Sequence, residues 1–120
     1  MLQVLIFLMV LVSVIPGSYT YASDSSNQLG TIEFPTSSSG SAQKHFIRGV
    51  AALHSFWYTE ALNAFEQSTI ADSEFAMGYW GLAMAHNHPL WEDQDKKSAR
   101  EALSKITDTS KLTQLSLIHI

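Results

Sequence analysis

The chain contains no cysteine, and this absence excludes disulfides, a thiolate zinc site and a cysteine nucleophile. No lysine or arginine precedes Lys44, and the net charge over the 120 residues is −4. A chain with this excess of negative charge lacks the basic patch that nucleic acid binding requires. Phosphate-binding loops, dinucleotide fingerprints and Gly-x-Ser-x-Gly elbows are also missing. We therefore expect no enzyme activity and no nucleic acid partner.

One long hydrophobic run is present, at the start of the chain. Residues 4–15 are apolar apart from Ser13, and the Pro-Gly-Ser sequence at residues 16–18 then breaks the helix. Ala22 supplies a small residue for cleavage, so residues 1–22 have the pattern of a secretory signal peptide. The run is shorter than the roughly 20 apolar residues of a membrane span. This pattern predicts a secreted or periplasmic protein with no membrane contact beyond its export signal. The alternatives are an uncleaved anchor and a buried core helix.

After the signal peptide, the pattern of the chain changes twice. Residues 23–40 are rich in Ser, Thr, Asn and Gly and are predicted to be a flexible leader. Within this leader, we expect Ile32 and Phe34 to lie against the helices that follow. From Ser41 onward, apolar residues recur with the period of a helix. The pattern predicts an all-α fold with about four helices, over residues 41–56, 61–70, 74–87 and 93–106.

Three glycines, Gly49, Gly78 and Gly81, fall inside the predicted helices. In a helix, each glycine costs up to about 1 kcal/mol relative to alanine. A residue without a side chain, however, lets a neighbouring helix approach closely. We therefore expect helices to pack tightly at these three positions.

Two segments of the helical region share a spacing. Gly49 and Ala83 are 34 residues apart and stand at the same place in each segment. Residues 76–86 follow the order aromatic, two residues, Leu, small residue, two residues, ring side chain. In the first segment, Tyr58, Ala61 and Phe65 stand where a turn aromatic, a small residue and a packing aromatic are expected. With this period and these residues, the chain resembles the tetratricopeptide (TPR) repeat family.

The resemblance implies stacked antiparallel helical hairpins, the start of an α-solenoid, over residues 41–73 and 74–107. The second hairpin has an enlarged turn. The resemblance also implies a scaffold that binds a protein or peptide in a groove, without cofactor or metal. The first helices of the hairpins would line this groove with Phe46, Val50, His54, Trp80, Met84 and His88.

Two alternatives to this interpretation remain open. Trp80 and Met84 can instead pack against the leader or against further repeats. The hairpins can also be the N-terminal repeat region of a larger extracytoplasmic enzyme or metal-binding protein. A metal site at His86 and His88 is disfavoured, because residues two apart on a helix point to nearly opposite sides and no cysteine completes a zinc set.

Residues 108–120 are interpreted as a tail. Its last six residues, 115–120, read as a translation of CTG TCT CTT ATA CAC ATC, the mosaic end of a transposase-based sequencing adapter. At least three repeats are normally needed for a stable stack. We therefore expect the natural protein to continue past Gln114 with more repeats, the alternative being a genuine hydrophobic tail. Sequencing the gene across this junction tests the hypothesis.

Overall fold

The computed structural model describes residues 29–119, and the predicted signal peptide lies outside this range. The described chain is all-α, which confirms the predicted fold class. Its helices are α2 (Gly40–His54), α3 (Tyr58–Ala71), α4 (Ala76–Ala85), α5 (Lys96–Ser104) and α6 (Gln114–His119). Within residues 29–119, no helix is both long and apolar enough to cross a membrane.

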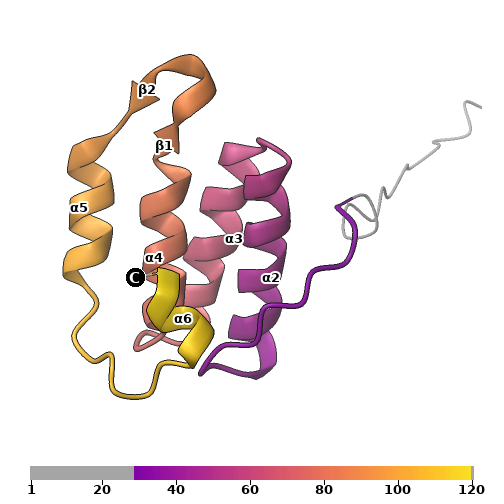
Figure 1. The fold of residues 1–120 in the computed structure, drawn as a ribbon, viewed down its shortest axis with the longest axis vertical. Helices are drawn as coiled ribbons and strands as arrows, with labels where there is room; N and C mark the ends of the chain where they lie inside the picture. The colour runs from indigo at the N-terminus through magenta and orange to yellow at the C-terminus, as the bar shows by residue number, and fades with distance from the viewer. Residues whose placement is uncertain (1–28, 120) are drawn as a thin grey trace, which may run out of the picture.

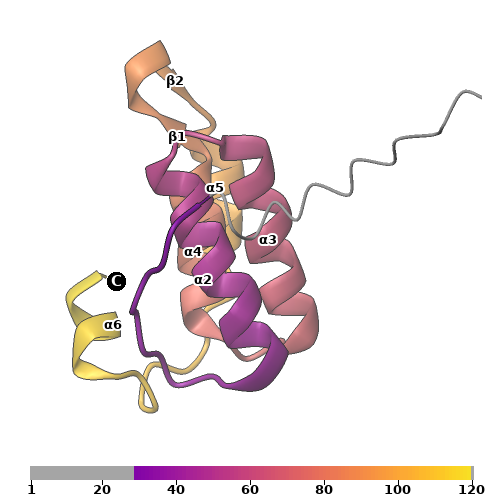
Figure 2. The same cartoon turned by 90° about the vertical axis from the view of Figure 1, so that its right-hand side faces the viewer.

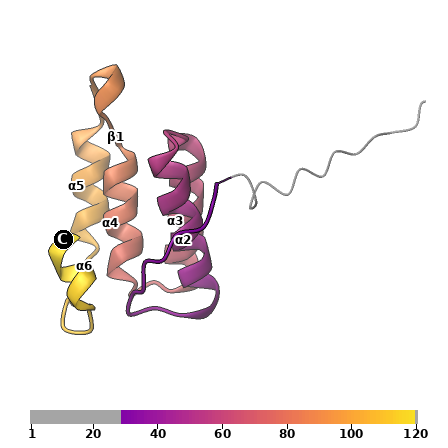
Figure 3. The ribbon, with the colours of Figure 1, turned by 45° about the vertical axis from the view of Figure 1, so that its right-hand side comes forward.

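The four longer helices stand side by side in chain order, each packed against the next (Figure 1, Figure 3). Short turns at residues 55–57 and 72–75 connect α2 to α3 and α3 to α4. Because a short turn reverses the direction of the chain, the consecutive helices pack as antiparallel pairs.

The enlarged turn that the sequence predicts between α4 and α5 is a small hairpin. Its strands β1 (Asn87–His88) and β2 (Asp93–Gln94) pair antiparallel, and the 3-10 turn η2 (Pro89–Trp91) lies between them. In the ladder, Asn87 faces Gln94 and His88 faces Asp93. The hairpin projects beyond the helix ends, beside the turn that connects α2 to α3 (Figure 1).

The core of the helical stack is built around Phe65 of α3, whose side chain is fully buried. A β-carbon added at Gly49 of α2 would lie 2.6 Å from this ring, and one added at Gly81 of α4 would lie 2.3 Å from it. A β-carbon at Gly78 would lie 2.7 Å from the Ser68 hydroxyl oxygen. These distances are too short for any side chain, so the predicted tight packing at the three glycines is confirmed.

The leader is packed where the structure describes it. Residues 29–39 run along α2 (Figure 2), and three of their apolar side chains lie against the core: Leu29, Ile32 and Phe34. Gln43 Nε2 also donates a hydrogen bond to the carbonyl oxygen of Phe34, at 2.7 Å. The predicted contact of Ile32 and Phe34 with the helices is confirmed. The half-buried side chains fix where residues 29–39 lie, and the flexibility expected of residues 23–40 stays a prediction.

Helix α5 begins three residues later than the sequence predicts, because residues 93–94 pair with β1 instead. Asp95 then caps the helix, and its carboxylate accepts hydrogen bonds from the Ser98 amide at 3.0 Å and the Ser98 hydroxyl at 2.6 Å. These hydrogen bonds lower the pKa of Asp95. An aspartate at this position satisfies amide groups that have no partner within the first turn of the helix.

Candidate functional site

The structure closes part of the groove that the sequence predicts. Phe46 and Val50 are only 0% and 3% exposed. The ring of Phe34 packs edge-on against Phe46, with 5.2 Å between the ring centroids. The groove prediction is therefore wrong for Phe46 and Val50, because both side chains lie in the core and Phe34 of the leader also covers Phe46.

Trp80 of α4 is half-buried on the same face. Its ring lies 6.4 Å from Phe34 and 6.4 Å from Phe46. His119 of α6 lies 5.6 Å from Trp80 and 5.1 Å from Phe34. Trp80 thus packs against the leader, which is one of the alternatives that the sequence left open.

The other three predicted groove residues do not join Trp80 in a common cleft. Met84 is exposed on α4, and His54 is exposed at the end of α2. His88 lies in β1, where its ring packs against Tyr58 at the start of α3. Of the six residues, the structure brings only Phe46 and Trp80 into ring contact.

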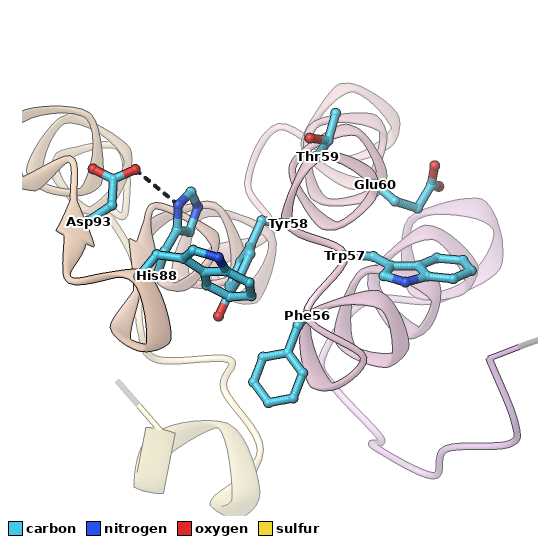
Figure 4. A pocket seen from close by; sticks show the side chains of 8 residues that line it. Phe56, Trp57, Tyr58, Thr59, Glu60, His88 and Asp93 are labelled. Carbon is cyan, nitrogen blue, oxygen red and sulfur yellow. Dashed lines mark hydrogen bonds and ion pairs between the residues drawn. The ribbon is translucent and has the colours of Figure 1, made fainter.

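A different surface is open, at the end of the molecule where the α2–α3 turn meets the β1–β2 hairpin. Four large apolar side chains are exposed there, and we call them the turn-end surface: Phe56 at 52%, Trp57 at 47%, Leu90 at 66% and Trp91 at 61%. Beside them lies a hollow of about 650 Å³ (Figure 4). Its lining consists of Phe56, Trp57, Tyr58, Thr59, Glu60, His88, Trp91 and Asp93.

Three aromatic rings of this lining are steeply inclined to one another. The centroids of Tyr58 and Trp91 are 5.7 Å apart, and their planes make an angle of 87°. Phe56 lies 6.4 Å from Trp91 at 65° and 6.5 Å from Tyr58 at 61°. Edge-to-face contacts of this kind are favourable arrangements of aromatic rings. The three rings therefore support one another while part of their surface stays open to water.

His88 fastens the hairpin to the helices. Its ring stacks on Tyr58 with 4.1 Å between centroids. Its Nε2 lies 2.9 Å from the carbonyl oxygen of Ala85, and its Nδ1 lies 3.3 Å from Asp93 Oδ2 (Figure 4). The side chain links β1, β2 and α3 at the edge of the hollow.

Phe56 has an unusual backbone for a bulky residue. The Phe56 amide donates to Leu53 O at 3.1 Å, and the Trp57 amide donates to Ala52 O at 2.9 Å. This pair of bonds is the Schellman arrangement, in which the residue after the helix cap is left-handed and is usually glycine. Phe56 occupies that position with a φ of 60°. A non-glycine residue there costs roughly 1–2 kcal/mol.

Glu92 is the second non-glycine residue with a positive φ, at 52°, in the part of the chain that the structure describes. It directly follows Trp91, so both left-handed positions lie beside exposed aromatic side chains of the turn-end surface. Strained backbone of this kind tends to gather at functional sites. The observation therefore points to the turn-end surface as the candidate site.

Sequence reasoning missed this surface, although a signal for it was present. Phe56 and Leu90 are 34 residues apart, and so are Trp57 and Trp91. This is the spacing that relates Gly49 to Ala83, so the paired turns follow the same period as the helices. Neither pair fits the apolar face of a helix. A repeated pair of large apolar residues outside the helical pattern could have identified residues exposed in two equivalent turns.

Across residues 29–119, no three His, Asp or Glu side chains gather in a way that could hold a metal ion. Comparisons of the chain with protein-family models, curated proteins and solved structures give no match. The TPR resemblance therefore stays a prediction.

Proposed function

We propose that the chain is an exported, TPR-like helical scaffold that binds a protein or peptide and carries out no chemistry of its own. The binding site in this proposal is the turn-end surface, in place of the groove along α2 and α4. The observation that carries the proposal is the exposure of Phe56, Trp57, Leu90 and Trp91 on two adjoining turns. Phe56 and Trp91 are in ring contact, and exposed apolar side chains that gather in this way are typical of an interaction site.

The composition of the surface supports protein recognition. Tryptophan and tyrosine are enriched among the residues that contribute most to the free energy of protein binding, because they bury a large rigid area. Tyr58 and Trp91 support each other by ring contact, and His88 fixes the hairpin beside them. A partner then meets side chains that are already ordered, so less conformational entropy is lost on binding.

The backbone at Phe56 supports the same conclusion. Glycine at this left-handed position would relieve the strain, yet the chain carries an exposed phenylalanine there. The strained residue does not fill the core, since more than half of its surface meets water. A role of the ring in binding accounts for its presence.

Selection of peptides on the full-length chain tests the proposal. We expect a displayed peptide library to yield sequences that bind the wild-type chain and lose binding to the Phe56→Gly and Trp91→Ala variants. Ile70→Ala is the matched control, because Ile70 is 70% exposed and lies at the opposite end of α3. A library that yields no binder, or only peptides that bind all variants equally, contradicts the proposal.

Export rests on residues 1–22 and is tested separately. We expect these residues to direct a fused reporter out of the cell and to be removed after Ala22. Terminal sequencing of the exported reporter measures the cleavage point. A reporter that stays in the cytoplasm overturns export without affecting the binding proposal.

A further inference from the structure

We infer that the partner of the turn-end surface presents an arginine beside a large apolar side chain, and that its guanidinium group lies on Trp91 and bonds to Asp93. This inference rests on the proposed function, because it names the chemistry recognised at the same site. Three observations carry it: the one-sided charge of the hollow, a carboxylate that is available there, and the exposed apolar side chains around it.

The lining of the hollow has an excess of acidic side chains. Its carboxylates belong to Glu60 and Asp93, and it contains no lysine or arginine. Glu92, which directly precedes Asp93, adds a further exposed carboxylate beside the hollow. An excess of carboxylates at an interface favours a positively charged partner and disfavours a negatively charged one. A basic side chain is therefore the complement of this surface.

Of the two carboxylates in the lining, Asp93 is the one available to a partner. Glu60 Oε1 is paired with Arg48 Nε at 2.8 Å, and the Glu60 side chain extends to the other side of the turn from Tyr58 (Figure 4). Asp93 is 73% exposed, and it contacts His88 through Oδ2, at 3.3 Å. Its other oxygen, Oδ1, can accept a hydrogen bond from a partner.

A guanidinium group suits these surroundings better than an ammonium group. It is planar, so it stacks on one open aromatic surface and needs no enclosure by several rings. Trp91 offers such a surface, because it is 61% exposed although Phe56 and Tyr58 contact it at steep angles. The fork of N–H donors can reach Asp93 from there, since Trp91 and Asp93 line the same hollow. The remaining donors stay in water, because the hollow is open to solvent.

The apolar side chains around the hollow require an apolar neighbour of this arginine. Leu90 is 66% exposed and Phe56 is 52% exposed. A basic peptide without large apolar side chains would leave much of this area in water. An apolar side chain next to the arginine removes that area from water, which is favourable. The partner segment therefore combines the two residue types.

The sequences of selected peptides test the inference first. The displayed library of the proposed function is selected in parallel on the wild-type chain, on Asp93→Asn and on Glu92→Gln. Glu92→Gln is the matched control, because Glu92 is exposed beside Asp93 but does not line the hollow. On the wild type and on Glu92→Gln, we expect enrichment of arginine next to a large apolar residue. On Asp93→Asn, we expect this enrichment to disappear.

The same selection distinguishes this inference from the proposed function. Binders that depend on Phe56 and Trp91 but show no enrichment of arginine overturn the inference and leave the proposed function standing. Enrichment that persists on Asp93→Asn places the arginine at another site and also overturns the inference. A library that yields no binder overturns the proposed function, and the inference with it.

Exchange of the arginine in the tightest selected peptide tests the guanidinium group itself. The peptide is remade with citrulline, which keeps the planar shape without the charge, and with lysine, which keeps the charge without the plane. Tryptophan fluorescence follows the titrations. We expect the wild-type chain to bind the arginine peptide at least about fivefold more tightly than either replacement. Citrulline or lysine that binds as tightly as arginine overturns the inference.

Asp93→Asn completes this test, with circular dichroism as the check that the variant is folded. We expect the substitution to weaken the arginine peptide at least about fivefold and to leave the citrulline peptide unchanged. Equal weakening of the two peptides would mean that the variant distorts the hairpin, and it would overturn Asp93 as the partner of the arginine.

A second copy of the chain and a lipid surface are the other possible occupants. Analytical ultracentrifugation of the full-length chain measures self-association, and flotation with phosphatidylcholine vesicles measures lipid binding. We expect neither to change in Trp91→Ala. A dimer that Trp91→Ala dissociates, or vesicle binding that Trp91→Ala abolishes, overturns a peptide as the occupant of this surface.

Discussion

The face formed by α2 and α4 and the turn-end surface both carry aromatic residues, but only one of them is covered. On the helical face, Phe34 of the leader packs against Phe46 and Trp80. At the turns, Phe56 and Trp91 remain more than half exposed. The comparison shows that the same residue types serve stability in one region and are available for recognition in the other.

Position relative to the helix ends explains this difference. Phe46 lies inside α2, where residues of the neighbouring helices and the leader surround it. Phe56 lies beyond the end of α2, in a turn that has a neighbour on one side, the β1–β2 hairpin. A side chain at the end of a stack has fewer neighbours to cover it. Its exposed area is available to a partner.

The largest expected effect concerns the covered region. Ala61→Arg places a charged side chain at a position of α3 that is fully buried. An unpaired charge in the core costs several kcal/mol, which is comparable with the whole stability of a small domain. We expect loss of the cooperative thermal transition in circular dichroism. A melting curve like that of the wild type would contradict the packing of α3.

A matched pair of tryptophan substitutions tests the comparison directly. Trp80→Ala removes a half-buried ring that contacts Phe34 and Phe46, and we expect a loss of about 2 kcal/mol. Trp91→Ala removes a ring that is 61% exposed but contacts Phe56 and Tyr58, and we expect a smaller loss, of about 1 kcal/mol. Thermal melts measure both. Equal destabilisation would show that the two regions do not differ as described.

The left-handed position of Phe56 separates stability from binding. We expect Phe56→Gly to be about 1 kcal/mol more stable than Phe56→Ala, because only glycine adopts a φ of 60° without strain. Both variants lack the ring and should lose the partner equally. Urea unfolding measures the stability and peptide capture measures the binding. If the glycine variant is no more stable than the alanine variant, the backbone at residue 56 is not strained.

The smallest expected effect is the pH dependence of α5. Hydrogen bonds from Ser98 lower the pKa of Asp95 in the folded chain, so its carboxylate stabilises the helix above the unfolded pKa. This contribution is lost as the pH falls through the lowered folded value. We expect Asp95→Asn to melt below the wild type at neutral pH, and the difference to vanish in strong acid. A difference independent of pH would contradict the cap.

Local sequence pattern was sufficient for the fold class and for the close packing at Gly49 and Gly81. It also placed Phe34 against the helices, but it could not identify Phe46 and Trp80 as the residues that Phe34 contacts, because these contacts depend on the path of the leader in three dimensions. Nor could it show the hairpin at residues 87–94, because each of its strands has only two residues. The candidate site was missed for a related reason. Phe56 adopts a backbone conformation that its residue type disfavours.

The position of Phe65 between Gly49 and Gly81 has a consequence for motion. Backbone lies against its ring from α2 and from α4, so the ring cannot rotate about its axis unless the two helices separate slightly. Slow rotation would give separate NMR signals for protons on opposite edges of the ring. The temperature at which those signals merge would report how often α2 and α4 separate far enough for the ring to turn.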